Sequence, residues 1–369
     1  MIDLGALRAN FAEAQRLAGG RRVIAVVKAD GYGHGGVAVS RALVAAGCEQ
    51  LAVVAVEEAC ELRDAGIALP ILVLGGVMED PGLAVARGLT PVIHHRGHLE
   101  ALARAAKERD TRCTVHVEVD SGMSRMGVPA DEAPALLADV AAEPALDLEG
   151  VYTHFAWADE SDLAPSLAQL ASFREVLAQL RARGIAPRLV HCANSAGLVA
   201  GKPFFEAVPE TNAVRPGLML YGVQPSDHSD AALRPVMTLQ TRVVHVREVE
   251  PGVAVGYAAL WRAERRTRVA TLPVGYADGL MIGASNRGEV LIAGRRHPMI
   301  GRVSMDFVGC DVGEADVAVG DEALLFGAGP DGGIPVEELA RAAGTIPYEV
   351  LVRVGLRVPR VILEQGGRP

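Results

Sequence analysis

The chain has 369 residues, of which 50% are hydrophobic and 22% charged, and its formal net charge is −9. This length can form two domains with a large core, and the composition is that of an ordinary globular protein. The acidic balance argues against nucleic acid or an anionic membrane as the main partner, and no apolar run is long enough to span a membrane. The five cysteines are scattered without a C-x-x-C pair. We therefore expect a cytoplasmic protein without a metal site.

The first two thirds of the chain alternate short apolar runs with segments of helical spacing. One such segment, Leu167–Arg183, stops at Gly184, as expected of a helix that ends at a glycine. Repeated strand–helix units predict a (β/α)8 barrel, like the TIM barrel, with an open doubly wound sheet as the alternative. The eight candidate strands are Val23–Val27, Leu51–Val56, Pro70–Leu74, Thr90–His94, Thr114–Val119, Gly150–His154, Leu189–His191 and Val214–Tyr221.

The pattern changes near Leu233. From Met237 onward the segments alternate in polarity and are richer in Val, Thr and Gly, which predicts a mainly-β domain containing one helix, Pro335–Ala343. We therefore predict a barrel over residues 1–232 and a β-rich C-terminal domain over residues 233–369. Its candidate strands are Gln240–Val249, Arg268–Val274, Gly288–Ile292 and Asp306–Val312.

Lys28 stands at the end of the first candidate strand and opens a glycine-rich segment, KADGYGHG, over residues 28–35. The C-terminal ends of barrel strands form the catalytic face. A lysine partly removed from water there has a lowered pKa, and its free amine suits Schiff-base chemistry. For an isolated lysine, a solvated strand end is the alternative interpretation.

The segment KADGYGHG resembles the pyridoxal-phosphate attachment motif of the alanine racemases. This resemblance implies a barrel that binds pyridoxal 5′-phosphate (PLP) and a following β domain. It also implies a homodimer in which the partner's β domain completes each active site. The implied reaction is the racemisation of alanine, which supplies D-alanine for peptidoglycan. Matching segments follow in the same order along the chain: Val119–Gly127, Thr153–Glu160, His191–Gly197, Val214–Gly222, Pro273–Gly279, Gly301–Phe307 and Arg357–Arg360.

The resemblance also implies which residues bind the cofactor. Lys28 would carry PLP as a Schiff base and would act as one of two acid–base groups. Arg215 would face the pyridine nitrogen, and His154 would contact Arg215. The phosphate would be held by Tyr32, Ser195 and the backbone amides of Gly217 and Leu218.

The remaining implied residues act on the substrate. Tyr257 of the other subunit would be the second base, across the Cα–H bond from Lys28, and two opposed bases explain inversion in both directions. Arg125 suits the substrate carboxylate because a guanidinium donates two parallel hydrogen bonds. Met305 and Asp306 would lie beside that carboxylate. The channel leading to the site would be lined by Tyr276, Arg302 and Asp159.

The chain departs from the family pattern at three places. Many members have a carbamylated lysine that orients the arginine; here the position is Glu118, and we hypothesise that its carboxylate holds Arg125 instead. Many members have a tyrosine that narrows the pocket where this chain has Leu356, which favours a looser pocket. The segment Ile2-Asp3-Leu4 also lies closer to the start than in most members, so this edge is either truncated or built differently.

Three other functions stay open. A broader racemase acting on serine would fit a looser pocket. A PLP-binding carrier without turnover resembles the barrel alone, and the β domain with Tyr257, Met305 and Asp306 argues against it. A PLP decarboxylase would place a carboxylate at the pyridine nitrogen, and Arg215 argues against that.

Overall fold

The computed structural model describes residues 1–77, 80–329 and 332–364. They form two compact units, each with its own core. The barrel unit comprises Leu7–Gly31 and Gly36–Leu233. The β unit comprises Met1–Ala6, Tyr32–Gly35 and the chain from Arg234 onward. Two short segments that precede residue 233 thus belong to the β unit, and the limits 1–232 and 233–369 stay a prediction.

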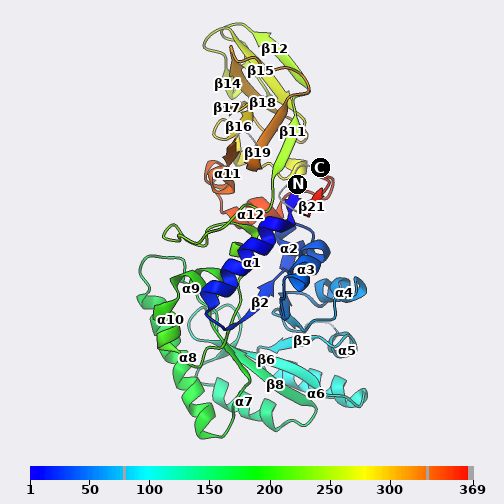
Figure 1. Cartoon of the computed structure of the whole chain (residues 1–369), viewed down its shortest axis with the longest axis vertical. Helices are drawn as coiled ribbons and strands as arrows, with labels where there is room; N and C mark the ends of the chain where they lie inside the picture. The colour runs from blue at the N-terminus through cyan, green and yellow to red at the C-terminus, as the bar shows by residue number, and fades with distance from the viewer. Residues whose placement is uncertain (78–79, 330–331, 365–369) are drawn as a thin grey trace. The chain divides into compact units, whose positions relative to one another are not determined.

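Eight parallel strands form the core of the barrel unit (Figure 1). The first, β2, pairs with both β3 and β10, and the pairing of β5 with β6 closes the ring. A closed ring confirms the predicted barrel over the open sheet, because an open sheet would leave two unpaired edges. The strands are β2 (Arg22–Val26), β3 (Gln50–Val53), β4 (Ile71–Val73), β5 (Thr90–Ile93), β6 (Cys113–Asp120), β8 (Leu146–Tyr152), β9 (Leu189–His191) and β10 (Ala213–Val214); β7 (Val128–Pro129) pairs with β6.

Helices surround these strands (Figure 1). In α6 the buried residues include Leu99, Leu102 and Ala106, a helical spacing that turns one apolar face to the sheet. The helix predicted at Leu167–Arg183 is confirmed as α8, and Gly184 follows it with φ +71°. The longer helices are α1 (Leu4–Ala18), α3 (Gly36–Ala45), α4 (Val56–Asp64), α5 (Pro81–Ala86), α6 (Arg96–Glu108), α7 (Ala133–Ala142), α8 (Ala164–Ala182), α9 (Ser195–Ala200) and α10 (Lys202–Ala207).

Two of the barrel strand predictions need correction. The last barrel strand was predicted over Val214–Tyr221, but β10 ends at Val214 and a 3-10 helix, η1 (Leu218–Tyr221), follows. Pro216 has no N–H for a sheet ladder, so the strand stops there. The strand predicted at Gly150–His154 is β8, which begins four residues earlier, at Leu146, and ends at Tyr152.

An eight-stranded sheet forms the β unit, which confirms the mainly-β prediction. The segment predicted as one strand over Gln240–Val249 is two strands, β11 and β12, at opposite ends of the strand order. Ile2 and Asp3 form β1, which pairs in parallel with β21 (Ile362–Leu363). The sheet contains β11 (Leu239–Arg242), β12 (His245–Val249), β15 (Thr267–Leu272), β16 (Glu289–Ile292), β17 (Arg295–Ile300), β18 (Val308–Gly313), β19 (Glu322–Gly329) and β20 (Gly332–Ile334); β13 (Ala254–Val255) and β14 (Trp261–Arg262) pair separately.

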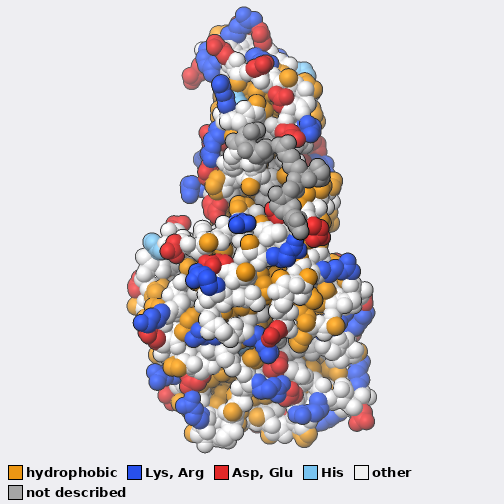
Figure 2. All heavy atoms as spheres, viewed as in Figure 1, with side chains coloured by type: hydrophobic (Ala, Val, Ile, Leu, Met, Phe, Trp, Pro, Cys, Tyr) orange, Lys and Arg blue, Asp and Glu red, His pale blue; other side chains and the backbone are white. Residues whose placement is uncertain are grey.

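The predicted helix Pro335–Ala343 is α11 (Val336–Ala343), and a short second helix, α12 (Pro347–Val352), was not predicted. Among the described residues, every helix is too short or too polar to cross a bilayer. On the visible face of each unit, acidic and basic side chains are intermixed (Figure 2). This face therefore shows no broad surface of a single charge.

Candidate active site

Lys28 begins a left-handed turn at the end of β2. The short element α2 (Lys28–Gly33) has positive φ at five consecutive residues, with values of +53°, +54°, +61°, +54° and +79° over residues 29–33. Three of these residues are not glycine, and a left-handed conformation costs about 1–2 kcal/mol for each such residue. Glu58 supports the turn, because its Oε1 accepts a hydrogen bond from the amide of Ala29 at 2.6 Å. Backbone strain of this kind is typical of functional sites.

Half of the other described strained positions also flank predicted site residues. The non-glycine residues with positive φ are Ala29, Asp30, Tyr32, Asp110, Ser124, Ala258, Ala259, Asn286 and Ala293. Of these nine described residues, six lie in or next to the Lys28 turn, before Arg125 or just after Tyr257. Strained backbone therefore occurs in the segments that contain the predicted site residues Lys28, Arg125 and Tyr257.

Lys28 and Arg125 are charged groups with no partner of their own. Within the described ranges, neither side chain forms a hydrogen bond or an ion pair. Burial and the nearby charge of Arg125 lower the pKa of Lys28, although Glu58 opposes the shift. Arg125 follows β6 in an exposed loop. A partly buried amine with a lowered pKa is suited to attack a carbonyl carbon.

His154 lies two residues beyond β8 and links the charged groups electrostatically. Burial lowers its pKa to about 3, and the charges of Arg215, Arg125 and Lys28 add to this effect. The charge of Glu118 acts to raise the pKa of His154. Four charged side chains thus act electrostatically on one neutral imidazole, and one of them, Arg215, lies within hydrogen-bond distance of it.

Arg215 is 3% exposed and is held through two of its three nitrogens. Its Nη1 donates to Nδ1 of His191 at 2.5 Å. Its Nη2 donates to the carbonyl of Thr153 at 2.9 Å and lies 3.2 Å from Nδ1 of His154. Within the residues that the structure describes, Nε has no hydrogen-bond partner, so this N–H is available to a ligand.

Ser195 and Gly217 form a small polar cradle beside Arg215. The Ser195 hydroxyl, at the start of α9, accepts a hydrogen bond from the amide of Gly217 at 2.9 Å and lies 3.3 Å from the amide of Met219. The next residue of the predicted set, Leu218, begins η1. Backbone amides together with a hydroxyl are a common environment for a phosphate group.

Glu118 is a buried carboxylate with two hydrogen-bond partners that the sequence did not reveal. Its Oε2 accepts from the Tyr152 hydroxyl at 2.9 Å and lies 3.1 Å from Nε2 of His94. Burial raises the pKa of Glu118, but these hydrogen bonds and the charge of Arg215 outweigh it, so the pKa is lowered overall. Glu118 is therefore a fixed anion, and no hydrogen bond joins it to Arg125 within the described residues.

The predicted residues of the β unit lie in three neighbouring segments. Gly301 packs against the carbonyl of Val255, next to Tyr257, and the amide of Tyr276 donates to Ser304 at 3.0 Å. Tyr257 is 70% exposed and Met305 52% exposed, while Arg302 lies on the surface. Arg357 donates to a carboxylate oxygen of Asp306 at 2.8 Å. The structure thus places Tyr257, Tyr276, Arg302, Met305 and Asp306 in one region of the β unit.

Three positions stand apart from these groups. Tyr32 belongs to the β unit, where it is buried with its ring 6.2 Å from that of Tyr348. Asp159 is exposed in the loop after β8. Leu356 is 96% exposed, so its side chain narrows no pocket within the β unit.

Motif analysis missed His116, His191 and Tyr152 as site residues. A signal was present for His116, because side chains two apart in a strand share a face and His116 is two residues from Glu118 on β6. Tyr152 stacks on His191 with ring centres 4.7 Å apart, and the Arg215 guanidinium lies 4.4 Å from the Tyr152 ring centre.

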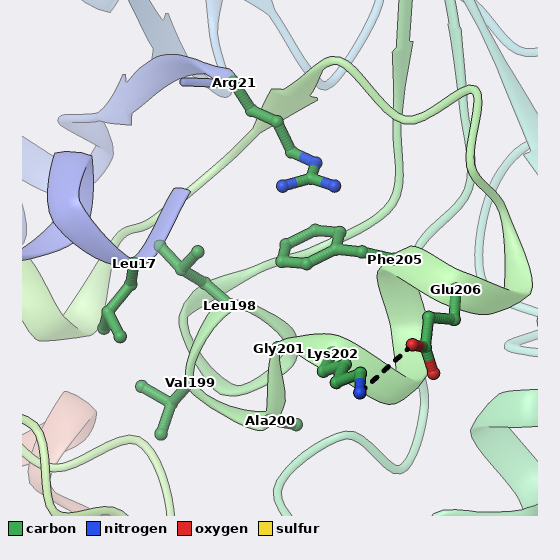
Figure 3. A pocket seen from close by; sticks show the side chains of 9 residues that line it. All are labelled: Leu17, Arg21, Leu198, Val199, Ala200, Gly201, Lys202, Phe205 and Glu206. Atoms are coloured by element: carbon green, nitrogen blue, oxygen red, sulfur yellow. Dashed lines mark ion pairs between the residues drawn. The ribbon is translucent and has the colours of Figure 1, made fainter. Parts of the chain in front are cut away.

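A surface pocket of about 520 Å³ lies elsewhere in the barrel unit (Figure 3). Arg21 covers the ring of Phe205 at 3.8 Å, and Lys202 pairs with Glu206 at 3.4 Å. The described residues that line this pocket include none of the predicted site residues. It is therefore separate from the candidate active site.

Comparison with known proteins gives the same family for both units. The N-terminal domain model of alanine racemase matches residues 2–225, and the C-terminal domain model matches residues 236–362. The alanine racemase of Desulforamulus reducens is 43% identical over 98% of each chain. The structure of alanine racemase from D-cycloserine-producing Streptomyces lavendulae has 36% identity and a TM-score of 0.93, covering 100% of this chain and 96% of that one. The alanine racemase of Bartonella henselae, solved with covalently bound pyridoxal phosphate, has 29% identity and a TM-score of 0.88 over 98% of each chain. The chain belongs to the alanine racemase family.

Proposed function

We propose that this protein interconverts L-alanine and D-alanine with PLP held in the barrel unit by Lys28. The observation that carries the proposal is the electrostatic grouping at His154, where an unpartnered lysine of lowered pKa and a buried arginine act on one neutral imidazole. The PLP bound covalently to the Bartonella henselae relative supports the choice of cofactor.

The donors in the barrel unit fit the chemistry of PLP. The Lys28 amine would bind the aldehyde carbon, and the free Nε–H of Arg215 would donate to the ring nitrogen. Ser195 and the amides of Gly217 and Leu218 would hold the phosphate. Tyr32, four residues after Lys28 along the chain, is the further phosphate ligand that the family resemblance implies. An arginine stays protonated at this position, so it donates a hydrogen bond without giving up its proton.

When bound, PLP withdraws electrons from the substrate Cα and makes its hydrogen acidic. Lys28 would move the Cα proton on one face, and Tyr257 of a second copy of the chain would move it on the other. The high exposure of Tyr257 supports this assignment, because its phenol is accessible to another molecule. We therefore propose a homodimer with shared active sites.

The substrate carboxylate would be bound by Arg125 and by the backbone N–H of Met305, and Asp306 would lie beside it. The lack of a partner for Arg125 within the described residues leaves its guanidinium available for this contact. Glu118 would orient Arg125 through its charge. Tyr276, Arg302 and Asp159 would line the channel by which the amino acid reaches the site.

We place the reaction in the cytoplasm, where D-alanine would be supplied for peptidoglycan. The five cysteines are free, and four of them are buried. Unpaired cysteines suit a reducing compartment.

The test is to incubate the PLP-loaded protein with single L-amino acids and to resolve the products by chiral chromatography. Fast formation of D-alanine with little else supports the proposal, whereas D-serine at a comparable rate indicates a broader racemase. No inversion of any amino acid would refute it and would favour a carrier. Lys28→Ala is expected to remove the activity.

A mixing experiment tests the shared site. Lys28→Ala and Tyr257→Phe proteins should each be inactive as homodimers. After unfolding and joint refolding, one site of each mixed dimer has both bases intact, so about one quarter of the wild-type activity should return. No recovery would contradict a site shared between two subunits.

A further inference from the structure

A chain of hydrogen bonds runs from Arg215 through two fully buried histidines to a partly buried acid on another strand. Arg215 Nη1 lies 2.5 Å from Nδ1 of His191, on β9. The Nε2 of His191 lies 2.8 Å from Nδ1 of His116, on β6. The Nε2 of His116 lies 3.1 Å from Oε2 of Glu149, on β8. Both histidines have no exposed surface, although barrel interiors are normally filled by apolar side chains.

The direction of every hydrogen bond in this chain is fixed by its ends. Arg215 can only donate, so Nδ1 of His191 must accept, and the neutral ring carries its hydrogen on Nε2. That hydrogen is donated to Nδ1 of His116, whose own hydrogen therefore lies on Nε2. Glu149, as a carboxylate, accepts it. Each ring nitrogen of the two histidines is therefore either a donor or an acceptor, and not both.

Electrostatics favours the same arrangement. Burial lowers the pKa of His191 and of His116, so both rings are neutral. The hydrogen bond from His116 is the main cause of the lowered pKa of Glu149. One cation and one anion therefore end the chain, and hydrogen bonds in series inside a protein polarise one another.

The backbone is adapted to this contact at two residues. The register between β6 and β8 shifts so that Val115 pairs with Leu148 and His116 with Gly150, which leaves Glu149 as the extra residue of a bulge. Bulges are rare between parallel strands and often redirect a side chain. A Cβ on Gly150 would lie 2.4 Å from Cε1 and Nδ1 of His116, so only glycine leaves room for the ring.

We propose that His116 and Glu149 are positioning residues for Arg215, acting through His191. Glu149 provides the final acceptor, and the chain holds Nη1 so that the Nε–H of Arg215 stays directed to its ligand. This inference rests on the proposed role of Arg215 at the PLP ring.

Three variants of the PLP-loaded protein test the inference. Glu149→Leu removes the acceptor and is expected to lower kcat for alanine about 10-fold in both directions, as loss of a supporting partner commonly does. Glu149→Gln keeps an acceptor oxygen and should retain kcat within about threefold. In His116→Asn the amide oxygen can take the place of Nδ1 as acceptor for His191. In that background Glu149→Leu should have no further effect on kcat.

Asp147→Asn is the matched control. Asp147 lies on the same strand and binds Arg188 at 2.6 Å, and Arg188 also lies 3.7 Å from Oε1 of Glu149. This variant therefore weakens the shared arginine contact but leaves the hydrogen bond between His116 and Glu149 in place. It should racemise alanine like the wild type. If wild type and control are both inactive, the proposed function fails, and the NMR measurement below decides whether the chain of hydrogen bonds exists.

Nitrogen-15 NMR of histidine-labelled protein gives a readout independent of activity. In the wild type, His116 and His191 should both carry hydrogen on Nε2 alone, and Glu149→Gln should preserve this. Glu149→Leu should perturb the His116 signals. Unchanged kcat in Glu149→Leu, or a wild-type His191 with its hydrogen on Nδ1, would overturn the inference.

Discussion

The Tyr152 hydroxyl provides a direct measure of how strongly the barrel interior binds a buried anion. It donates to Oε2 of Glu118 at 2.9 Å, and Tyr152 is 2% exposed. Tyr152→Phe keeps the stacking on His191 and the contact with Arg215, so only this hydrogen bond is lost. Because the acceptor is a carboxylate, the variant should lose about 1.5–3 kcal/mol of unfolding free energy.

The matched control is Tyr221→Phe. Tyr221 is also buried, but its hydroxyl donates to a neutral acceptor, the carbonyl of Val26, at 3.0 Å. Loss of this hydrogen bond should lower the unfolding free energy by about 0.5–1.5 kcal/mol, so the unfolding free energies of the two variants should differ by about 1 kcal/mol.

Urea unfolding provides the assay. The two tryptophans are Trp157 in the barrel unit and Trp261 in the β unit, so a Trp261→Phe background restricts the fluorescence signal to the barrel. The shift in midpoint at constant m-value gives the change in free energy. Equal losses for the two variants would refute the charged hydrogen bond at Glu118.

Three further outcomes are expected. Gly150→Ala should lower the unfolding free energy by about 1–3 kcal/mol in the same urea assay, because its Cβ would overlap the His116 ring. An unchanged unfolding free energy would mean that the ring has room to move. The pKa values of Glu118 and Glu149 are lowered from 4.5, so their stabilisation is complete above that pH and is lost as the pH falls through the lower folded values. Urea midpoints should therefore drop below about pH 4, and less steeply for Glu149→Gln. His154, with a pKa of about 3, should show no protonation by NMR between about pH 5 and pH 8; a titration near the usual histidine value would contradict its burial beside Arg215.

The fold could be predicted largely because its strands are short apolar runs buried on both faces, as parallel strands are. The predictions failed where polar side chains enter the interior. The part of β8 missed before Gly150 contains Asp147 and Glu149, and a pattern based on hydrophobicity excludes both. The eighth strand was predicted too long because Leu218–Tyr221 is apolar and buried, like a strand of the barrel. In the structure this segment is a 3-10 helix.

The residues of the site could be predicted, but the backbone turn and the contacts that hold them in place could not. The motif at Lys28 identified the segment, while its left-handed turn was hidden, since Ala29 and Tyr32 have no preference for positive φ. His94 and Tyr152 approach Glu118 from other strands, and such contacts depend on barrel closure. No spacing along the chain encodes them.

Arg215 connects two acids of the barrel, the buried Glu118 and the partly buried Glu149. One branch passes through Tyr152, whose ring lies under the guanidinium and whose hydroxyl binds Glu118. The other passes through His191 and His116 to Glu149. The branches touch, because Tyr152 stacks on His191 with an angle of 14° between the rings.

Loss of the hydrogen bond to Glu118 or to Glu149 should therefore change how strongly the other branch holds Arg215. Tyr152→Phe and Glu149→Leu, combined in one protein, should change the unfolding free energy by at least about 0.5 kcal/mol more or less than the sum of the single variants. The cycle is measured by urea unfolding in the Trp157-only background. Strict additivity would show that the two branches act independently on Arg215.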